Sequence, residues 1–218
     1  MTIDYAKVRE NMVEQQVRPW DVLDGRVLEA LSAVPRDAFV PEAYRALAYA
    51  DLELPIGHGQ SMMKPVVEGR MLQGLELDAG DEVLEIGTGT GFVTACLGYL
   101  ARDVHSLEIV PELAAAASAR LAQRGHDSNV RIEAADALAW NTSRRFDAIC
   151  VTAAVDTVPA RFVEWLRPGG RLFVVRGRAP VMEAVCLRNE VNGARIESLF
   201  ETELQYLAGA APAPEFHL

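Results

Sequence analysis

From residue 83 onward, short apolar runs alternate with segments of helical periodicity, and this alternation constrains the fold more than any other feature. Short apolar runs predict strands, and segments with apolar residues three and four apart predict helices. Strands that alternate with helices of about ten residues are typical of βαβ units, with a parallel sheet covered on both faces. The predicted strands are 83–86, 104–107, 130–133, 148–152 and 171–175, and the predicted helices are 92–100, 111–123 and 158–166.

The two ends of the chain differ from this pattern. Two further strand-like runs, 184–187 and 196–200, flank Asn192-Gly193, and this dipeptide between strands predicts an antiparallel hairpin at the sheet edge. Residues before 77 have mainly helical periodicity. The segment 51–65 holds two Pro and two Gly without periodicity, so we predict a functional loop there. We therefore expect an α/β, doubly wound, mostly parallel sheet in a domain over 78–218, preceded by a helical region over 1–77.

Composition and charge exclude several classes of protein. No run of 18 apolar residues and no signal-peptide pattern occurs, so we expect a cytoplasmic protein without a membrane partner. The net charge is −10 and basic residues do not cluster, which argues against a nucleic-acid partner. The three cysteines lie in apolar runs and the four histidines have no ligand spacing, so we expect neither a disulfide nor a metal site.

A glycine-rich turn follows the first predicted strand of the sheet. Residues 85–91 read Glu-Ile-Gly-Thr-Gly-Thr-Gly and lead directly into a predicted helix. Glycines at such a turn let the backbone bend sharply and let a ligand approach the main chain. A tight strand-to-helix turn without any ligand is the alternative interpretation of this segment.

Acidic residues after the strands favour a nucleoside ligand. Glu108 ends the next predicted strand, where a carboxylate accepts hydrogen bonds from ribose hydroxyls. Asp136 follows the third strand and suits an adenine amino group, and Thr152 ends the fourth strand beside the expected crevice. Phe92 stands where a dinucleotide motif needs glycine, and no P-loop pattern occurs. The spacing resembles motif I of class I methyltransferases, so we predict S-adenosyl-L-methionine as cofactor, contacted by Glu85, Gly87, Thr88, Gly89, Gly91, Glu108, Ile109, Asp136, Ala137 and Thr152.

Nearly the whole chain resembles the protein-L-isoaspartate O-methyltransferase family. The residues that carry the resemblance include 34–36 (Val-Pro-Arg) with 39–41 (Phe-Val-Pro), 54–60 (Leu-Pro-Ile-Gly-His-Gly-Gln), the glycine turn, and 166–172 (Leu-Arg-Pro-Gly-Gly-Arg-Leu). The resemblance implies a Rossmann-like methyltransferase fold and methylation of the carboxylate of isoaspartyl residues in damaged proteins, which begins their repair.

The sequence departs from the family in segment 61–66, Ser-Met-Met-Lys-Pro-Val. The family serine and histidine of the active site are here Met63 and Val66. A carboxylate acceptor is already ionised at neutral pH and needs alignment rather than a general base. We therefore predict that Ser61 and Lys64 contact the acceptor. Three alternatives stay open: isoaspartyl repair, methylation of another acceptor such as a small carboxylic acid, and cofactor binding without catalysis.

Overall fold

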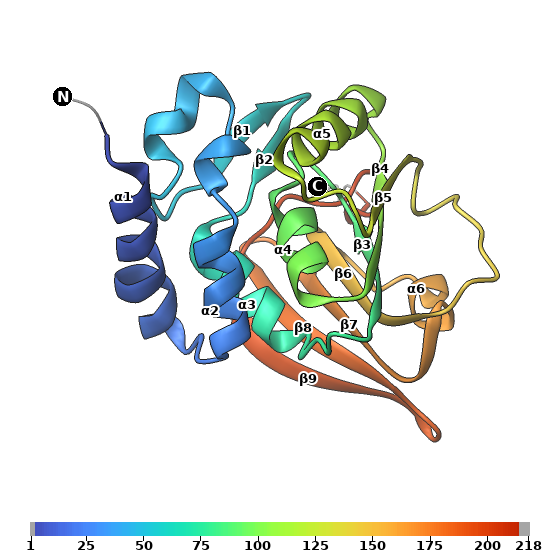
Figure 1. The fold of residues 1–218 in the computed structure, drawn as a ribbon. Helices are drawn as coiled ribbons and strands as arrows, with labels where there is room; N and C mark the ends of the chain where they lie inside the picture. Colours follow the sequence, from blue (N-terminus) through green and yellow to red (C-terminus); the bar gives the residue numbers. More distant parts are fainter. Residues whose placement is uncertain (1–2, 214–218) are drawn as a thin grey trace, which may run out of the picture.

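The computed structural model describes residues 3–213. A seven-stranded sheet forms its centre, with strand order β5-β4-β3-β6-β7-β8-β9 (Figure 1). Neighbouring strands in the part β5-β4-β3-β6-β7 of this order pair in parallel. Strands β8 and β9 each pair antiparallel with the strand before them. The strands are β3 (Glu82–Ile86), β4 (Asp103–Glu108), β5 (Val130–Ala134), β6 (Phe146–Val155), β7 (Leu166–Arg178), β8 (Val181–Glu190) and β9 (Gly193–Glu201). This arrangement confirms the predicted doubly wound, mostly parallel sheet with a C-terminal hairpin.

The strands are buried on both faces because alternate side chains enter two separate cores. Val83, Val104 and Cys150 belong to the core under α4 (Phe92–Leu100) and the N-terminal helices. Leu84, Ile149 and Val151 belong to the core under α6 (Ala160–Glu164). Period-two alternation explains this division, since successive strand side chains point to opposite faces. Helix α5 (Pro111–Arg124) follows β4 and packs against β4 and β5.

The N-terminal region extends the first of these cores. It contains α1 (Tyr5–Met12), a π-helical turn over Val13–Val17, α2 (Gly25–Ala33) and α3 (Pro65–Gly74). Helix α2 packs against both α3 and α4, so the helical region and the sheet share one continuous apolar core (Figure 1). The division at residue 77 expected from the sequence remains a proposal about domain organisation.

The predicted loop 51–65 was wrong in part, because it contains a two-stranded hairpin. Strand β1 (Leu54–Gly57) pairs antiparallel with β2 (Gln60–Met62). The turn between them is tight: Gly57, His58 and Gly59 all have positive φ. The sequence did not predict these strands because Pro55 and the glycines belong to residue types that are depleted in strands.

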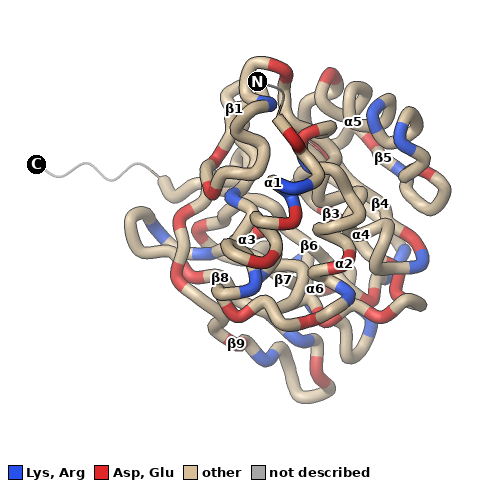
Figure 2. The backbone as a smooth tube through the Cα atoms, turned by 60° about the vertical axis from the view of Figure 1, so that its left-hand side comes forward, with Lys and Arg blue, Asp and Glu red and all other residues tan. Residues whose placement is uncertain are grey.

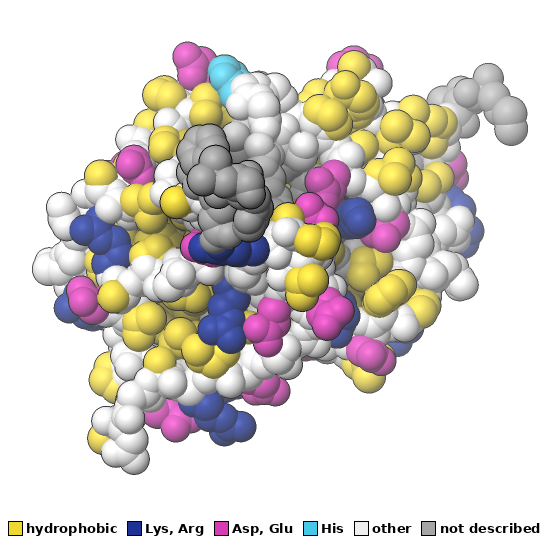
Figure 3. Space-filling view, turned by 180° about the vertical axis from the view of Figure 1, so that it is seen from behind, with side chains coloured by type: hydrophobic (Ala, Val, Ile, Leu, Met, Phe, Trp, Pro, Cys, Tyr) yellow, Lys and Arg dark blue, Asp and Glu magenta, His cyan; other side chains and the backbone are white. Residues whose placement is uncertain are grey.

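Charged residues of both signs are distributed over the described part of the chain (Figure 2, Figure 3). Acidic and basic residues are interspersed along the part of the backbone drawn in colour (Figure 2). The face opposite to that of Figure 1 likewise mixes apolar, acidic and basic side chains (Figure 3). Within residues 3–213, no helix has the length and apolar character needed to cross a membrane.

Candidate active site

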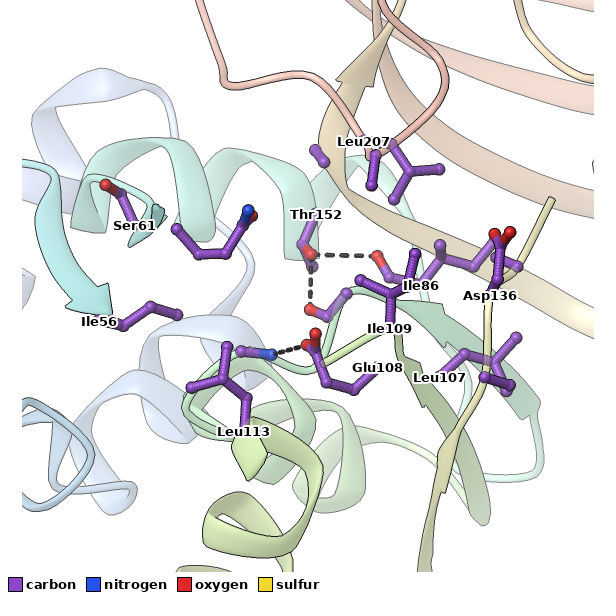
Figure 4. A pocket seen from close by; sticks show the side chains of 17 residues that line it. Ile56, Ser61, Ile86, Leu107, Glu108, Ile109, Leu113, Asp136, Thr152 and Leu207 are labelled. Carbon is purple, nitrogen blue, oxygen red and sulfur yellow. Dashed lines mark hydrogen bonds between the residues drawn. The ribbon is translucent and has the colours of Figure 1, made fainter. Parts of the chain in front are cut away.

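A cavity of about 80 Å³ lies at the carboxyl ends of the central strands. The chain leaves β3 toward β4 on one side, and β6 leads to β7 on the other, so the strand order reverses between β3 and β6. Ligands of open α/β sheets bind at such switch points. The cavity is lined by Ile56, Gln60, Ser61, Ile86, Gly87, Gly89, Leu107, Glu108, Ile109, Leu113, Ala135, Asp136, Ala137, Thr152, Ala153, Leu207 and Ala208 (Figure 4).

Two glycines border the cavity, and both have positive φ angles that disfavour a larger residue. Gly87 has a φ of +100°, and a Cβ atom there would overlap the Thr152 hydroxyl. That hydroxyl donates to the Gly87 carbonyl at 2.6 Å and so ties β6 to the glycine turn. Gly89 has a φ of +55°, and a Cβ atom there would lie 3.3 Å from Ile56 on the hairpin. The turn therefore presents bare main chain to the cavity.

Glu108 connects the glycine turn to the end of β4. Its Oε2 accepts from the Gly89 amide at 2.8 Å and its Oε1 accepts from the Val110 amide at 3.0 Å. The carboxylate is buried yet lines the cavity, where further lone pairs accept hydrogen bonds from ligand hydroxyls. Asp136 is exposed at the other end, and its Oδ1 accepts from the Leu138 amide at 2.8 Å. These two acids at one long cavity fit a nucleoside.

The structure brings most of the predicted cofactor contacts together. Gly87, Gly89, Glu108, Ile109, Asp136, Ala137 and Thr152 all line the large cavity. Thr88 borders a smaller cavity beside it, of about 40 Å³. Gly91 lines neither cavity: a Cβ atom there would lie 3.2 Å from Ala117, so this glycine allows the turn to pack against α5.

Glu85 also lies behind the cavity, where it supports the glycine turn through hydroxyl groups. Its Oε2 accepts from Ser106 at 2.5 Å and from Thr94 at 2.6 Å. Ser106 in turn shares a 2.5 Å hydrogen bond with Thr88 in the turn. The Oε1 atom is buried with no hydrogen-bond partner among the described residues. Burial raises the pKa of Glu85 to about 8, an effect that the two hydroxyl donors only partly offset.

We expect Glu85→Gln to become progressively more stabilising, relative to the wild type, as pH rises. A carboxyl whose pKa is raised in the folded state keeps its proton there, whereas the unfolded chain releases it above about pH 4.5. The wild type therefore loses stability between about pH 5 and 8, and the amide does not titrate. Urea unfolding of both proteins at the two pH values measures this. We expect the difference in unfolding free energy to grow by about 1–3 kcal/mol; a constant difference contradicts a protonated Glu85.

Ser61 lies where three cavities meet. It lines the large cavity, the smaller cavity beside the glycine turn, and a third cavity of about 30 Å³. Thr152 borders the same three spaces from the opposite side (Figure 4). Lys64 is exposed and borders none of them. The contact of Ser61 and Lys64 with the acceptor stays a prediction, and the geometry favours Ser61.

A buried ion pair holds the segment that follows Ser61. The Arg36 guanidinium donates to both oxygens of Glu68, at 3.1 and 3.2 Å, and its Nη2 donates to the Met63 carbonyl at 2.5 Å. Arg36 is fully buried and stacks over Phe92, 5.3 Å from the ring centroid. Desolvation raises the pKa of Glu68 to about 7, against the opposing effect of Arg36. The pair fixes the backbone at Met63, whose side chain lines the two smaller cavities.

Several lining residues were not predicted as site residues. Ile56 and Gln60 come from the hairpin, and Leu207 and Ala208 come from the segment after β9. The Gln205 side chain donates to the Gly59 carbonyl at 2.6 Å and joins these two segments over the site. The Leu-Pro-Ile-Gly-His-Gly-Gln motif was a usable signal for the hairpin. Nothing in the composition of 205–208 marks it as part of a site.

A Rossmann-like sheet with a glycine turn and an acid after the next strand defines an S-adenosylmethionine-dependent methyltransferase of class I. The family model described as protein-L-isoaspartate(D-aspartate) O-methyltransferase matches residues 7–199. The chain belongs to this family.

Individual relatives agree with this assignment. The chain is 41% identical over 193 residues to protein-L-isoaspartate O-methyltransferase 2 of Anaeromyxobacter sp. (strain Fw109-5), covering 88% of this chain and 79% of the relative. It is 39% identical over 198 residues to protein-L-isoaspartate O-methyltransferase 1 of Syntrophobacter fumaroxidans, covering 90% of this chain and 92% of the relative. A crystal structure of a Plasmodium falciparum protein-L-isoaspartate O-methyltransferase has a TM-score of 0.80 at 20% identity, covering 94% of this chain and 99% of that one, which supports the fold.

Proposed function

We propose that this enzyme methylates the free α-carboxylate of isoaspartyl residues in polypeptides. The observation that carries the proposal is the meeting of three cavities at Ser61 and Thr152, because it provides a direct path from a nucleoside site to an open acceptor site. Curated relatives that carry the isoaspartyl methyltransferase name share about two fifths of their residues with this chain over most of its length, which supports the choice of acceptor.

The residues of this chain bind the cofactor, align it with the acceptor, and exclude water from the site. S-adenosylmethionine supplies a methyl group activated on a sulfonium. Glu108 and Asp136 provide acceptors for the nucleoside, and the bare turn at Gly87 and Gly89 allows close approach to the main chain. Ile56 and Leu207 enclose the cavity with apolar side chains (Figure 4). An ionised carboxylate needs no general base, so alignment in a water-poor site carries the reaction.

The proposal is tested by comparing an isoaspartyl peptide with its normal aspartyl counterpart. Initial rates of methyl transfer from labelled cofactor should be measurable with the first peptide and at background with the second. Comparable rates with both peptides, or transfer to neither, contradict the proposed acceptor.

We expect Met63→Ser to raise the rate on the isoaspartyl peptide by about tenfold. Met63 lines the acceptor-side cavities in place of the family serine, and a hydroxyl there restores a donor for the carboxylate. One hydrogen bond to a charged group contributes about 1.5–3 kcal/mol when it acts in the transition state. Met63→Ala is the matched control, because it opens the same space without adding the donor. Equal gains from both variants show that space rather than hydrogen bonding limits the rate.

A further inference from the structure

The third cavity adjoins the expected acceptor site, and its lining includes the exposed residues Glu53 and Ser61. It lies between the β1–β2 hairpin and the segment that follows β9. It is lined by Glu53, Gln60, Ser61, Met62, Met63, Thr152, Ala153, Leu204 and Gln205. Four of these residues, Gln60, Ser61, Thr152 and Ala153, also line the large cavity. An acceptor chain that enters here therefore reaches the nucleoside site directly.

The charged side chains that line the three cavities, within the described chain, are all carboxylates. Glu108 and Asp136 belong to the nucleoside end, and Glu68 is neutralised by its pair with Arg36. Glu53 differs from these. It is exposed at the third cavity, and residues 3–213 provide it with no ion-pair partner within 4.0 Å. Its charge is therefore available to whatever enters.

Other charged residues near this entrance do not neutralise the negative charge of Glu53. Lys64 follows Met63 but is exposed and does not line the cavity. Asp51 lies in the same neighbourhood, since its Oδ1 accepts from the Val66 amide at the start of α3 at 3.4 Å. Neither Lys64 nor Asp51 lines the third cavity, which leaves Glu53 as the only charged side chain in its lining among the described residues. An acceptor carboxylate thus arrives at an entrance that is already negative.

We propose that the third cavity receives the polypeptide that carries the acceptor, and that Glu53 selects chains with a lysine or arginine beside the acceptor residue. This inference rests on the proposed polypeptide acceptor. A neighbouring cation gains an ion pair with Glu53, whereas a neighbouring carboxylate adds repulsion. Because Glu53 is exposed, the selection is moderate and sensitive to salt.

The test uses two isoaspartyl peptides that differ only in having Lys or Glu next to the isoaspartyl residue. Their binding to the full-length protein is measured with saturating S-adenosylhomocysteine, so that binding is observed without transfer. We expect the Lys peptide to bind the wild type about three- to tenfold more tightly at low salt. Glu53→Gln should reduce this ratio to below about twofold. Glu197→Gln, which removes an exposed charge on β9, should leave the ratio unchanged.

Three results would overturn the role of Glu53: equal binding of the two peptides, a preference that survives Glu53→Gln, or no binding of the Lys peptide. Methyl transfer is measured in separate samples that contain labelled S-adenosylmethionine in place of S-adenosylhomocysteine. If the charge preference is present but no methyl group is transferred, the proposed function fails while the role of Glu53 stands. The two proposals are therefore tested by different measurements.

Discussion

Glu108→Ala is expected to weaken S-adenosylmethionine binding by about ten- to a hundredfold. The substitution removes a charged acceptor from the cavity, which costs about 1.5–3 kcal/mol in binding. It also leaves the Gly89 and Val110 amides without the carboxylate oxygens that accept from them, so the glycine turn loses its link to β4. The loss therefore combines a missing ligand contact with a less ordered turn.

Isothermal titration calorimetry on the wild type and the variant measures this effect. Glu112→Ala is the matched control, because Glu112 is an exposed acid in the first turn of α5 and does not line the cavity. Its affinity should equal that of the wild type. Equal affinities of the Glu108→Ala and wild-type proteins, or preferential binding of NAD, would contradict the assigned cofactor site.

Arg36→Met is expected to lower the free energy of unfolding by about 3–5 kcal/mol. The substitution leaves Glu68 as a buried carboxylate without its cation, and breaking a buried pair in this way is strongly destabilising. The Met63 carbonyl also loses its donor. Without Arg36, the pKa of Glu68 rises further above its ordinary range, so the folded variant keeps the proton at neutral pH. The deficit should therefore be smaller near pH 5 and larger near pH 8.

The double variant Arg36→Met with Glu68→Leu distinguishes the loss of the ion pair from the cost of leaving one charge buried without its partner. Removing both charges replaces the ion pair by apolar contacts, which is often close to neutral. Urea unfolding should therefore show that the double variant recovers at least about 1–2 kcal/mol of the loss. If the loss of unfolding free energy in the double variant equals the sum of the losses in the Arg36→Met and Glu68→Leu single variants, the buried pair is not coupled as the structure indicates.

The sequence predicted the central sheet because its signals are local. Strand residues such as Val83 and Val104 lie in short apolar runs, and Asn192-Gly193 marks its own turn. Strand ends were underestimated: β7 extends over Leu166–Arg178, although only 171–175 was predicted. Most of the additional residues are arginine or glycine, and those after Val175 join the sheet by pairing with β8 rather than through a run of apolar side chains.

The candidate site was predictable only where the motif itself forms the cavity. Gly87, Gly89 and Glu108 are placed by the strand ends they follow, so their spacing was informative. The pairing of Arg36 with Glu68 joins positions 32 residues apart in sequence, which no periodicity reveals. Glu85 heads the same motif but points away from the cavity, because alternate residues of a strand face opposite sides.

The most direct test of the central claim is the chemical identity of the product. An equimolar mixture of the isoaspartyl peptide and its aspartyl counterpart is incubated with the enzyme and S-adenosylmethionine and then analysed by fragment mass spectrometry. We predict one added methyl group, on the free α-carboxylate of the isoaspartyl residue alone, and its loss as methanol in mild base. A base-stable methyl group on nitrogen, or equal methylation of both peptides, would contradict the account.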